Sequence, residues 1–168
     1  MNKIRHLIYV ILLIVIDQLT KLFAVTKLKD QESISIIPKV LRLYYHENTG
    51  AVWGILSDKT TLLALFSILI LCVMIFFYFR IPNEKHYNYL RLIIVFLTAG
   101  AIGNLIDRIA RKFVVDFIYF ELIDFPIFNV ADMYVSVSAF CLVLLTIFYY
   151  KDDDFSFLSN KDRKKHEG

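Results

Sequence analysis

Four long apolar stretches constrain this chain more than any other feature of its sequence. Residues 62–79 and 133–150 are each 18 residues long and contain no charged side chain. A helix must have about 20 mostly apolar residues to cross the roughly 30 Å of bilayer hydrocarbon. Two further stretches reach that length with a few polar interruptions. We therefore predict four membrane-spanning helices, at residues 7–25, 60–80, 90–109 and 129–150.

The composition agrees with an integral membrane protein. Hydrophobic residues make up 58% of the 168 positions, whereas soluble domains have about 45–50%. The net charge is only +3 and the basic residues are spread along the chain, so nucleic-acid binding is not expected. The predicted fold class is an all-α membrane protein that forms a single integral membrane domain over residues 1–168.

The first apolar stretch begins like a secretory signal, because Lys3 and Arg5 precede the run 7–16. The small-residue cleavage pattern of a signal peptide does not follow. The chain instead continues through Asp17 and Lys21 and then becomes apolar again. We therefore predict that this stretch is a retained span.

Basic residues are distributed unequally between the segments that connect the spans. Segments 1–6, 80–91 and 151–168 hold ten Lys and Arg in 36 positions, whereas segments 26–59 and 108–126 hold eight in 53. Loops enriched in Lys and Arg usually face the cytoplasm. The distribution predicts cytoplasmic termini, a solvated tail at 151–168, and outward segments at 26–59 and 110–128.

The outward segments carry signals for short strands. Alternating, β-branched or aromatic residues occur around 33–37, at 43–45 and at 113–128, as is typical of strands. Open strand edges cannot lie in hydrocarbon, so we predict a small extracytoplasmic β-cradle at the membrane interface. Residues 51–57 have a helical pattern and are predicted to form a short interfacial lid helix.

Asp17 and Lys21 are energetically unfavourable within a span, since inserting a charged side chain at the centre of a membrane helix costs about 2.5–3.5 kcal/mol. They are four positions apart, which places them on one face of a helix in the order that favours an ion pair. We interpret them as a structural polar pair that neutralises itself and holds the first span to its neighbours.

The third span ends with a polar stripe. Gly100, Asn104 and Arg108 follow one another at intervals of four, and Ala99 with Gly103 forms a pair of small residues that allows another helix to approach closely. Asn104 and Arg108 share one face at the outer membrane level. We predict that they bind the carbonyl groups of a peptide, and simple snorkelling toward the membrane interface is the alternative.

Two acids lie in apolar surroundings at the same outer level, Asp116 after the third span and Asp132 at the start of the fourth. Asn129 could cap the fourth helix with Asp132 in its first turn, but this structural reading does not explain Asp116, for which the sequence offers no partner. Two neighbouring carboxylates cannot both ionise. The charged one can deprotonate a water molecule while the protonated one polarises a carbonyl group. The sequence does not assign which acid acts as the base.

Other chemistries have little support in the sequence. The four histidines are scattered, and neither HExxH nor a zinc-ligand spacing of Cys and His occurs. The pattern GxSxG of serine hydrolases is also missing. We expect neither a metal nor a cofactor. A proton- or ion-coupled transporter and a non-catalytic scaffold remain open alternatives, although transporters usually place polar residues near the midplane and have repeated halves.

Five blocks, in this order along the chain, resemble the bacterial lipoprotein signal peptidases (signal peptidase II). They are DQLTK at 17–21, NTGAVWG at 48–54, GAIGNLIDR at 100–108, VDF at 115–117 and FNVAD at 128–132. The blocks extend from the first span to the fourth, so the similarity covers almost the whole chain. One departure is Trp53, which stands where phenylalanine is common in the family and predicts altered packing of the lid.

The resemblance implies an intramembrane aspartic endopeptidase that removes the signal peptide of a prolipoprotein before its diacylglyceryl-modified cysteine, using two aspartates and a water molecule. Asp116 and Asp132 match the catalytic pair, and the positions that match substrate-binding residues are Asn48, Gly50, Asn104, Arg108 and Asn129. Asp17 and Lys21 match positions that look structural in the family.

The resemblance also implies where the protein lies and what it meets. It predicts a multi-pass protein of the bacterial cytoplasmic (inner) membrane, with cytoplasmic termini and an active site toward the extracytoplasmic face. The expected partners are diacylglyceryl-modified prolipoproteins, membrane lipids and globomycin-type inhibitors. We expect the chain to act as a monomer.

Overall fold

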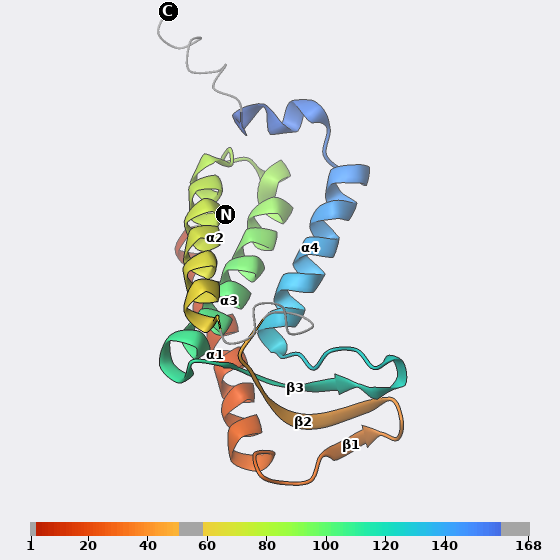
Figure 1. Ribbon diagram of the computed structural model, residues 1–168. Helices are drawn as coiled ribbons and strands as arrows, with labels where there is room; N and C mark the ends of the chain where they lie inside the picture. The colour runs from red at the N-terminus through yellow and green to blue at the C-terminus, as the bar shows by residue number, and fades with distance from the viewer. Residues whose placement is uncertain (1–2, 51–58, 159–168) are drawn as a thin grey trace, which may run out of the picture.

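The computed structural model describes residues 3–50 and 59–158, in which a bundle of four long helices has a small sheet at one end, beside the end of the first helix (Figure 1). The helices are α1 (Lys3–Lys27), α2 (Thr60–Arg80), α3 (Asn88–Arg111) and α4 (Val130–Phe148). Each is long and apolar enough to cross a membrane. The prediction of four spans is therefore confirmed, and the helices begin and end within a few residues of the predicted limits.

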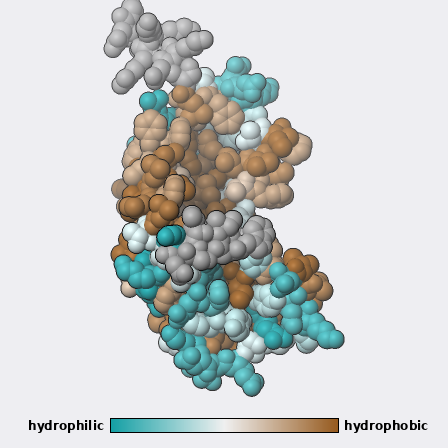
Figure 2. Space-filling model, viewed as in Figure 1, coloured by the Kyte–Doolittle hydropathy of each residue, from teal (hydrophilic) through white to brown (hydrophobic). Residues whose placement is uncertain are grey.

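The helix α3 is the centre of the bundle, because α1, α2 and α4 each pack against it. It holds the largest set of buried residues of the four helices, whereas α1, α2 and α4 expose many Leu, Ile, Val and Phe side chains. These exposed apolar side chains form a brown band over the helices, with hydrophilic surface below it on the sheet and above it at the opposite end (Figure 2). Such a band is the surface that bilayer hydrocarbon would cover.

Two glycines of α3 allow the neighbouring helices to come close. A Cβ atom added at Gly100 would lie 2.6 Å from the carbonyl oxygen of Ala131 in α4. One added at Gly103 would lie 2.5 Å from Oδ2 of Asp17 in α1. A larger residue at Gly100 would push against the backbone of α4, and one at Gly103 would displace the Asp17 carboxylate, so the predicted close approach of small residues is confirmed.

The sheet has the strand order β1-β2-β3 and is antiparallel. Its strands are β1 (Ile34–Ile37), β2 (Leu41–Asn48) and β3 (Val114–Phe120), and a 3-10 turn η3 (Glu121–Ile123) follows. Val115 and Phe117 of β3 are buried against Ala24 and Leu28 at the end of α1. The predicted strands are confirmed, and the predicted lid helix at 51–57, with Trp53, lies outside the described residues.

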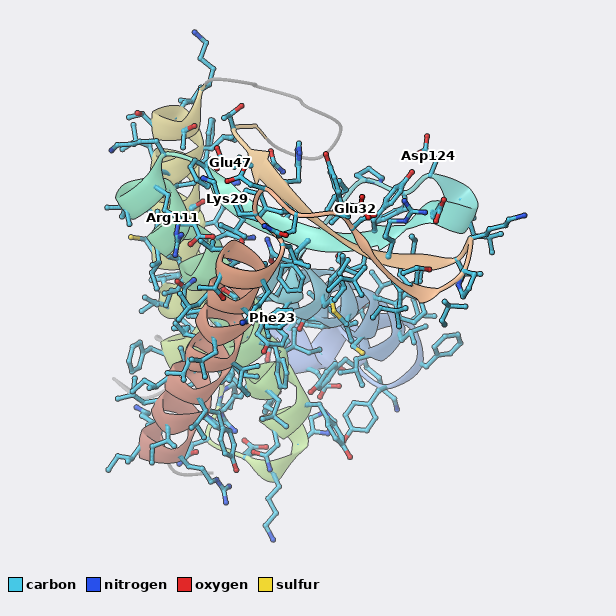
Figure 3. All side chains as sticks on the ribbon, turned by 90° about the horizontal axis from the view of Figure 1, so that it is seen from below. Phe23, Lys29, Glu32, Glu47, Arg111 and Asp124 are labelled. Carbon is cyan, nitrogen blue, oxygen red and sulfur yellow. The ribbon has the colours of Figure 1, made fainter. Side chains whose placement is uncertain are left out.

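An exposed ion pair also ties the end of α1 to the sheet. Nζ of Lys29 lies 2.9 Å from Oε1 of Glu47 in β2, and the hydroxyl of Tyr45 donates to the same oxygen at 2.8 Å. Figure 3, seen from the sheet end, shows Lys29 and Glu47 side by side above the end of α1. Because the sheet is attached to α1 in this way and through its buried face, β3 has a defined position beside the helices.

At the end of the bundle opposite the sheet, the structure differs from one prediction. The helix α4 ends at Phe148, and a 3-10 helix η4 (Asp152–Leu158) follows and packs Phe155 and Phe157 against the aromatic cluster of Tyr87 and Tyr150. That cluster also involves the short 3-10 turn η2 (Lys85–Tyr87) between α2 and α3. The expectation of a wholly solvated tail from residue 151 is therefore wrong for residues 152–158, because two phenylalanines among the acidic residues find an apolar partner.

Candidate active site

The two predicted catalytic acids meet where β3, the end of α3 and the start of α4 converge. Asp116 is the third residue of β3, and Asp132 lies in the first turn of α4. Asp116 is buried, with 1% of its surface exposed, whereas Asp132 is partly exposed. Two carboxylates from distant segments thus share one end of the helix bundle.

Asp116 has two amide partners that the sequence did not reveal. Asn48 of β2 donates from Nδ2 to Oδ2 of Asp116 at 2.8 Å, and Asn129 donates from Nδ2 to Oδ1 at 2.6 Å. The backbone N–H of Gly50 donates to Oδ1 of Asn48 at 2.9 Å, which fixes the orientation of that amide. Both carboxylate oxygens of Asp116 are therefore held by neutral donors.

Asp132 takes part in the capping of α4 and also has an amide partner. Oδ1 of Asn129 accepts from the N–H of Asp132 at 3.0 Å, and Oδ2 of Asp132 accepts from the N–H of Asn129 at 3.1 Å. This is a capping box, so the predicted cap is confirmed. Nδ2 of Asn104 donates to the other oxygen, Oδ1 of Asp132, at 2.7 Å. The capping role and a chemical role are therefore compatible, because the cap orients the carboxylate.

Asn129 bridges the two acids, since it bonds Asp116 through its amide nitrogen and Asp132 through its amide oxygen and its backbone. It is fully buried. Its Nδ2 also donates to Oδ1 of Asn104 at 3.1 Å. The two carboxylates thus belong to one continuous hydrogen-bonded network.

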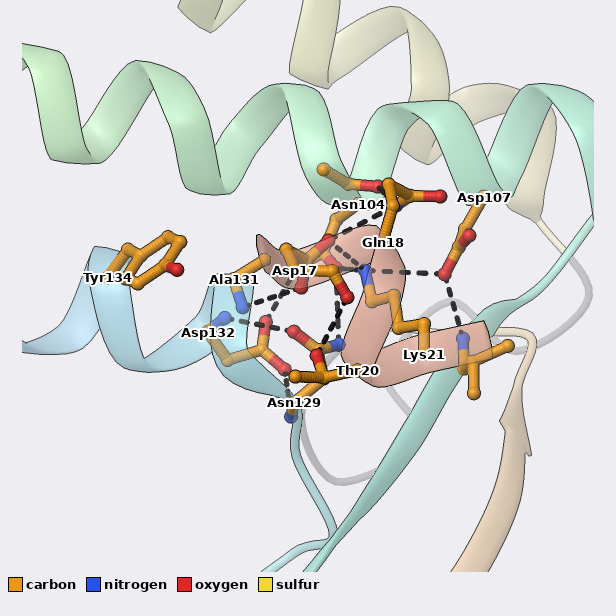
Figure 4. A network of polar contacts seen from close by, with 12 residues as sticks. Asp17, Gln18, Thr20, Lys21, Asn104, Asp107, Asn129, Ala131, Asp132 and Tyr134 are labelled. Carbon is orange, nitrogen blue, oxygen red and sulfur yellow. Dashed lines mark hydrogen bonds and ion pairs between the residues drawn. The ribbon is translucent and has the colours of Figure 1, made fainter. Parts of the chain in front are cut away.

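A buried ion cluster is joined to this network through Asn104 (Figure 4). Nζ of Lys21 lies 3.0 Å from Oδ2 of Asp17, 3.2 Å from Oδ2 of Asp107 and 2.8 Å from Oδ1 of Asn104. The side chains of both ion pairs are completely buried. Asp17 and Lys21 pair as their spacing predicts, and Lys21 additionally orients the amide of Asn104 toward Asp132.

Asp17 and Asp107 connect the same cluster to the backbone that carries the acids. Oδ1 of Asp17 accepts from the N–H of Ala131, next to Asp132, at 2.9 Å. Oδ2 of Asp107 accepts from the N–H of Val115, next to Asp116, at 3.1 Å. Sequence reasoning gave Asp107 no role, although the signal was present as a further acid on the polar end of the third span.

Arg108 is placed differently from the other predicted substrate-binding residues. It is partly exposed, and its guanidinium makes no hydrogen bond or ion pair with residues 3–50 or 59–158. It is nevertheless within electrostatic range of Asp132 and Asp116. Asn48, Asn104 and Asn129 already bond the acids, whereas within the described residues the guanidinium of Arg108 has unused donors.

The environment of Asp116 favours its neutral form. Burial raises the pKa of the Asp116 carboxyl to about 7, and the negative charge of Asp132 acts in the same direction against the hydrogen bonds from Asn48 and Asn129. A carboxyl with that pKa can hold a proton near neutral pH while a neighbouring carboxylate does not. Within the described part of the chain, no group of three or more His, Cys, Asp or Glu converges as metal ligands would.

Solved structures place this architecture among membrane enzymes. One bacterial membrane enzyme matches with a TM-score of 0.75 and 31% identity, over 98% of this chain and 93% of its own. Another matches with a TM-score of 0.74 and 33% identity, over 87% of this chain and 94% of its own. The four apolar helices and the polar site at their end thus define an integral membrane enzyme.

Sequence relatives specify the family. The family profile described as "Signal peptidase (SPase) II" matches residues 9–148. The lipoprotein signal peptidase of Clostridium tetani is 38% identical over 95% of this chain and 97% of its own, and that of Staphylococcus aureus is 37% identical over 92% and 90%. The chain belongs to the signal peptidase II family and is therefore a peptidase. The transporter and scaffold alternatives are wrong.

Proposed function

We propose that this chain removes signal peptides from diacylglyceryl-modified prolipoproteins, cleaving before the lipidated cysteine with Asp116 and Asp132 as its catalytic pair. Removal of signal peptides from prolipoproteins by an aspartic-type mechanism is general for its family. The observation that supports the residue assignment is the bridge through Asn129, whose Nδ2 donates to the Asp116 carboxylate and whose backbone N–H donates to the Asp132 carboxylate at one end of the bundle. Asp132 of this pair is partly exposed, whereas Asp17 and Asp107 are fully buried and bonded to Lys21.

The proposed reaction uses the pair in complementary protonation states. The ionised carboxylate takes a proton from a water molecule, which attacks the carbonyl carbon of the scissile peptide bond. The protonated carboxyl donates to the carbonyl oxygen and stabilises its developing charge. The tetrahedral intermediate then breaks the C–N bond, and the amine leaves with a proton from the pair. The proton belongs to the pair as a whole, so neither acid is assigned as the base.

Substrate binding is proposed to divide among residues around the pair. Asn48, Asn104 and Asn129 hold the carboxylates in place and thus act chiefly as positioning residues, while Arg108 donates to carbonyl groups of the extended peptide. Gly50 contributes by fixing Asn48. Asp17 and Lys21 are proposed to be structural.

The orientation is proposed from the charge distribution of the loops. Cytoplasmic termini would place the α2–α3 turn in the cytoplasm of a bacterial cell and the sheet with the acid pair at the outer face of its inner membrane. A monomer is proposed because one chain supplies both acids and, within the described residues, the amides that bond them. Globomycin-type inhibitors are expected to compete for the same pair.

The proposed activity is tested by incubating the detergent-purified chain with a diacylglyceryl-modified prolipoprotein and following loss of the signal peptide by gel shift. The unlipidated precursor is the matched substrate control, and a chelator is added in a parallel sample. We expect cleavage of the lipidated precursor alone, with or without chelator. Equal cleavage of both precursors would refute the proposed lipid requirement.

The pH dependence of cleavage follows from the pKa of Asp116. Below about pH 7 the pair retains one shared proton, and above it this proton is lost, so the active form disappears as pH rises. We expect kcat/KM to fall about tenfold per pH unit well above pH 7, and also to fall in acid when the pair takes a second proton. An initial-rate profile from pH 4 to 9 measures this, and a rate that still increases between pH 8 and 9 would contradict it.

A further inference from the structure

A polar hollow of about 170 Å³ lies at the end of the bundle opposite the sheet, between the start of α1 and the turn that joins α2 to α3. It is lined by Lys3, Tyr78, Phe79, Ile81, Asn83 and Arg91. Two of these residues are cations and none is an acid. At about 30 Å³ for each water molecule, the hollow has room for about five waters, which is too small for a drug-sized ligand but enough for a compact polar group.

Arg91 is a buried cation whose partners are all neutral. Only 4% of its surface is exposed. Its guanidinium donates to the carbonyl oxygen of Glu84 at 3.2 Å, to Oδ1 of Asn88 at 3.1 Å and to the carbonyl oxygen of Pro82. These bonds use three of the five N–H groups of the side chain. No carboxylate of residues 3–50 or 59–158 forms an ion pair with it, although buried charges are normally paired.

A second cation and a hydroxyl group, from Lys3 and Tyr78, also line the hollow. Nζ of Lys3 lies 5.0 Å above the ring of Phe79, which keeps the amine beside the hollow. The hydroxyl of Tyr78 lies 2.6 Å from Nδ1 of His6. His6 is almost fully buried, and its Nε2 has no partner among the described residues. When Nδ1 carries the proton, Tyr78 accepts it, and the hydroxyl hydrogen of Tyr78 is available to a ligand.

We propose that this hollow binds a phosphate group, supplied by the headgroup of an anionic membrane lipid or as inorganic phosphate. The donors are the kinds that recognise phosphate oxygens, namely a guanidinium, an ammonium and a hydroxyl group. A phosphate would also provide the counter-charge that Arg91 lacks. The hollow lies at the ends of the spans, which is the depth of lipid headgroups, and basic pockets between spans are suited to anionic headgroups.

The test measures ligand binding to the purified full chain by native mass spectrometry from a neutral detergent. The probes are dioleoylphosphatidylglycerol, dioleoylglycerol, which has the same chains without the phosphate, and inorganic phosphate. Two basic residues at about fivefold each should make the phospholipid bind about 25-fold more tightly than dioleoylglycerol. Displacement of the phospholipid by inorganic phosphate would identify the free ion as the ligand, and failure to displace it would identify the lipid.

Two single variants distinguish specific binding in the hollow from general attraction of an anionic lipid to surface charge. Lys3→Gln removes a cation from the wall, whereas Arg80→Gln removes one from the same end of the bundle outside the hollow, where Arg80 stacks on Phe76. Both side chains are exposed, so neither change should prevent folding. We expect Lys3→Gln to weaken phosphatidylglycerol binding about fivefold and Arg80→Gln less than about twofold. Equal weakening by the two variants, or equal binding of dioleoylglycerol and the phospholipid, would overturn the proposal.

Discussion

Asp116→Asn and Asp132→Asn are each expected to lower cleavage of a lipidated prolipoprotein by at least about 10²-fold and up to about 10⁴-fold, the range that a positioned acid or base contributes. An amide neither accepts a proton from water nor donates one with the acidity of a carboxyl group. The shape is conserved, so the membrane bundle should be retained. Initial rates of the purified variants under substrate excess provide the measurement.

The cost of these changes to folding should be small by comparison. An asparagine at position 116 turns an NH₂ group toward an amide donor of Asn48 or Asn129, which costs about one hydrogen bond, roughly 1–2 kcal/mol. The matched control is Asp124→Asn, because Asp124 is exposed and, among the described residues, its carboxylate accepts a hydrogen bond only from the hydroxyl of Tyr119. Full activity in Asp124→Asn with near-complete loss in the other two is the expected pattern. Rates within about tenfold of wild type in either variant would exclude that acid from the chemistry.

Lys21→Met is expected to destabilise the protein by about 3–5 kcal/mol, the effect of removing one partner from a buried ion pair. The change leaves the carboxylates of Asp17 and Asp107 buried without their shared cation. It also removes the donor that orients Asn104 toward Asp132. Thermal unfolding in detergent, together with the yield of folded protein, measures the loss.

The control for this prediction is Lys29→Met, which breaks a surface ion pair with Glu47 of similar length, 2.9 Å. That pair is exposed to solvent, and such pairs contribute little to stability. We expect Lys29→Met to unfold close to the wild-type temperature. The triple variant Lys21→Met, Asp17→Asn, Asp107→Asn should recover part of the lost stability, because it leaves no unpaired buried charge. Equal stability of Lys21→Met and wild type would contradict the buried cluster.

The cluster explains how the proposed catalytic pair can be held in position at the end of a membrane bundle. Asp17 holds the backbone beside Asp132, and Asp107 holds the backbone beside Asp116. Lys21 joins Asp17 to Asp107 and thereby connects α1 with α3. Groups that are held in place in this way keep the reacting atoms correctly positioned, so the site does not have to reorganise during the reaction.

The features that were predictable from the sequence depend on local patterns. The spans follow from runs of apolar residues, the strands from alternation, and the cap of α4 from Asn129 followed three positions later by Asp132. The close approach at Gly103 follows from the small-residue spacing. Each of these signals lies within a few turns of helix or a single strand.

The features that were missed depend on contacts between distant segments. Asn48 and Asp116 are 68 positions apart, and Lys21 and Asn104 are 83 apart. No local pattern indicates that Asn48 and Asn104 bond the acids instead of leaving their amides free for a substrate. The end of α4 was misplaced by two residues because Tyr149 and Tyr150 are apolar enough to continue a span, but Tyr150 instead packs into the aromatic cluster around Tyr87.

The central claim is that Asp116 and Asp132 perform the chemistry and do not merely support the fold. It is tested most directly by measuring substrate binding and cleavage in one sample of the double variant Asp116→Asn, Asp132→Asn. We predict that the variant binds a diacylglyceryl-modified prolipoprotein with a Kd within about tenfold of wild type, about 1.4 kcal/mol, and does not cleave it. Cleavage at a rate near that of wild type would contradict the claim, and so would loss of binding together with loss of the folded state.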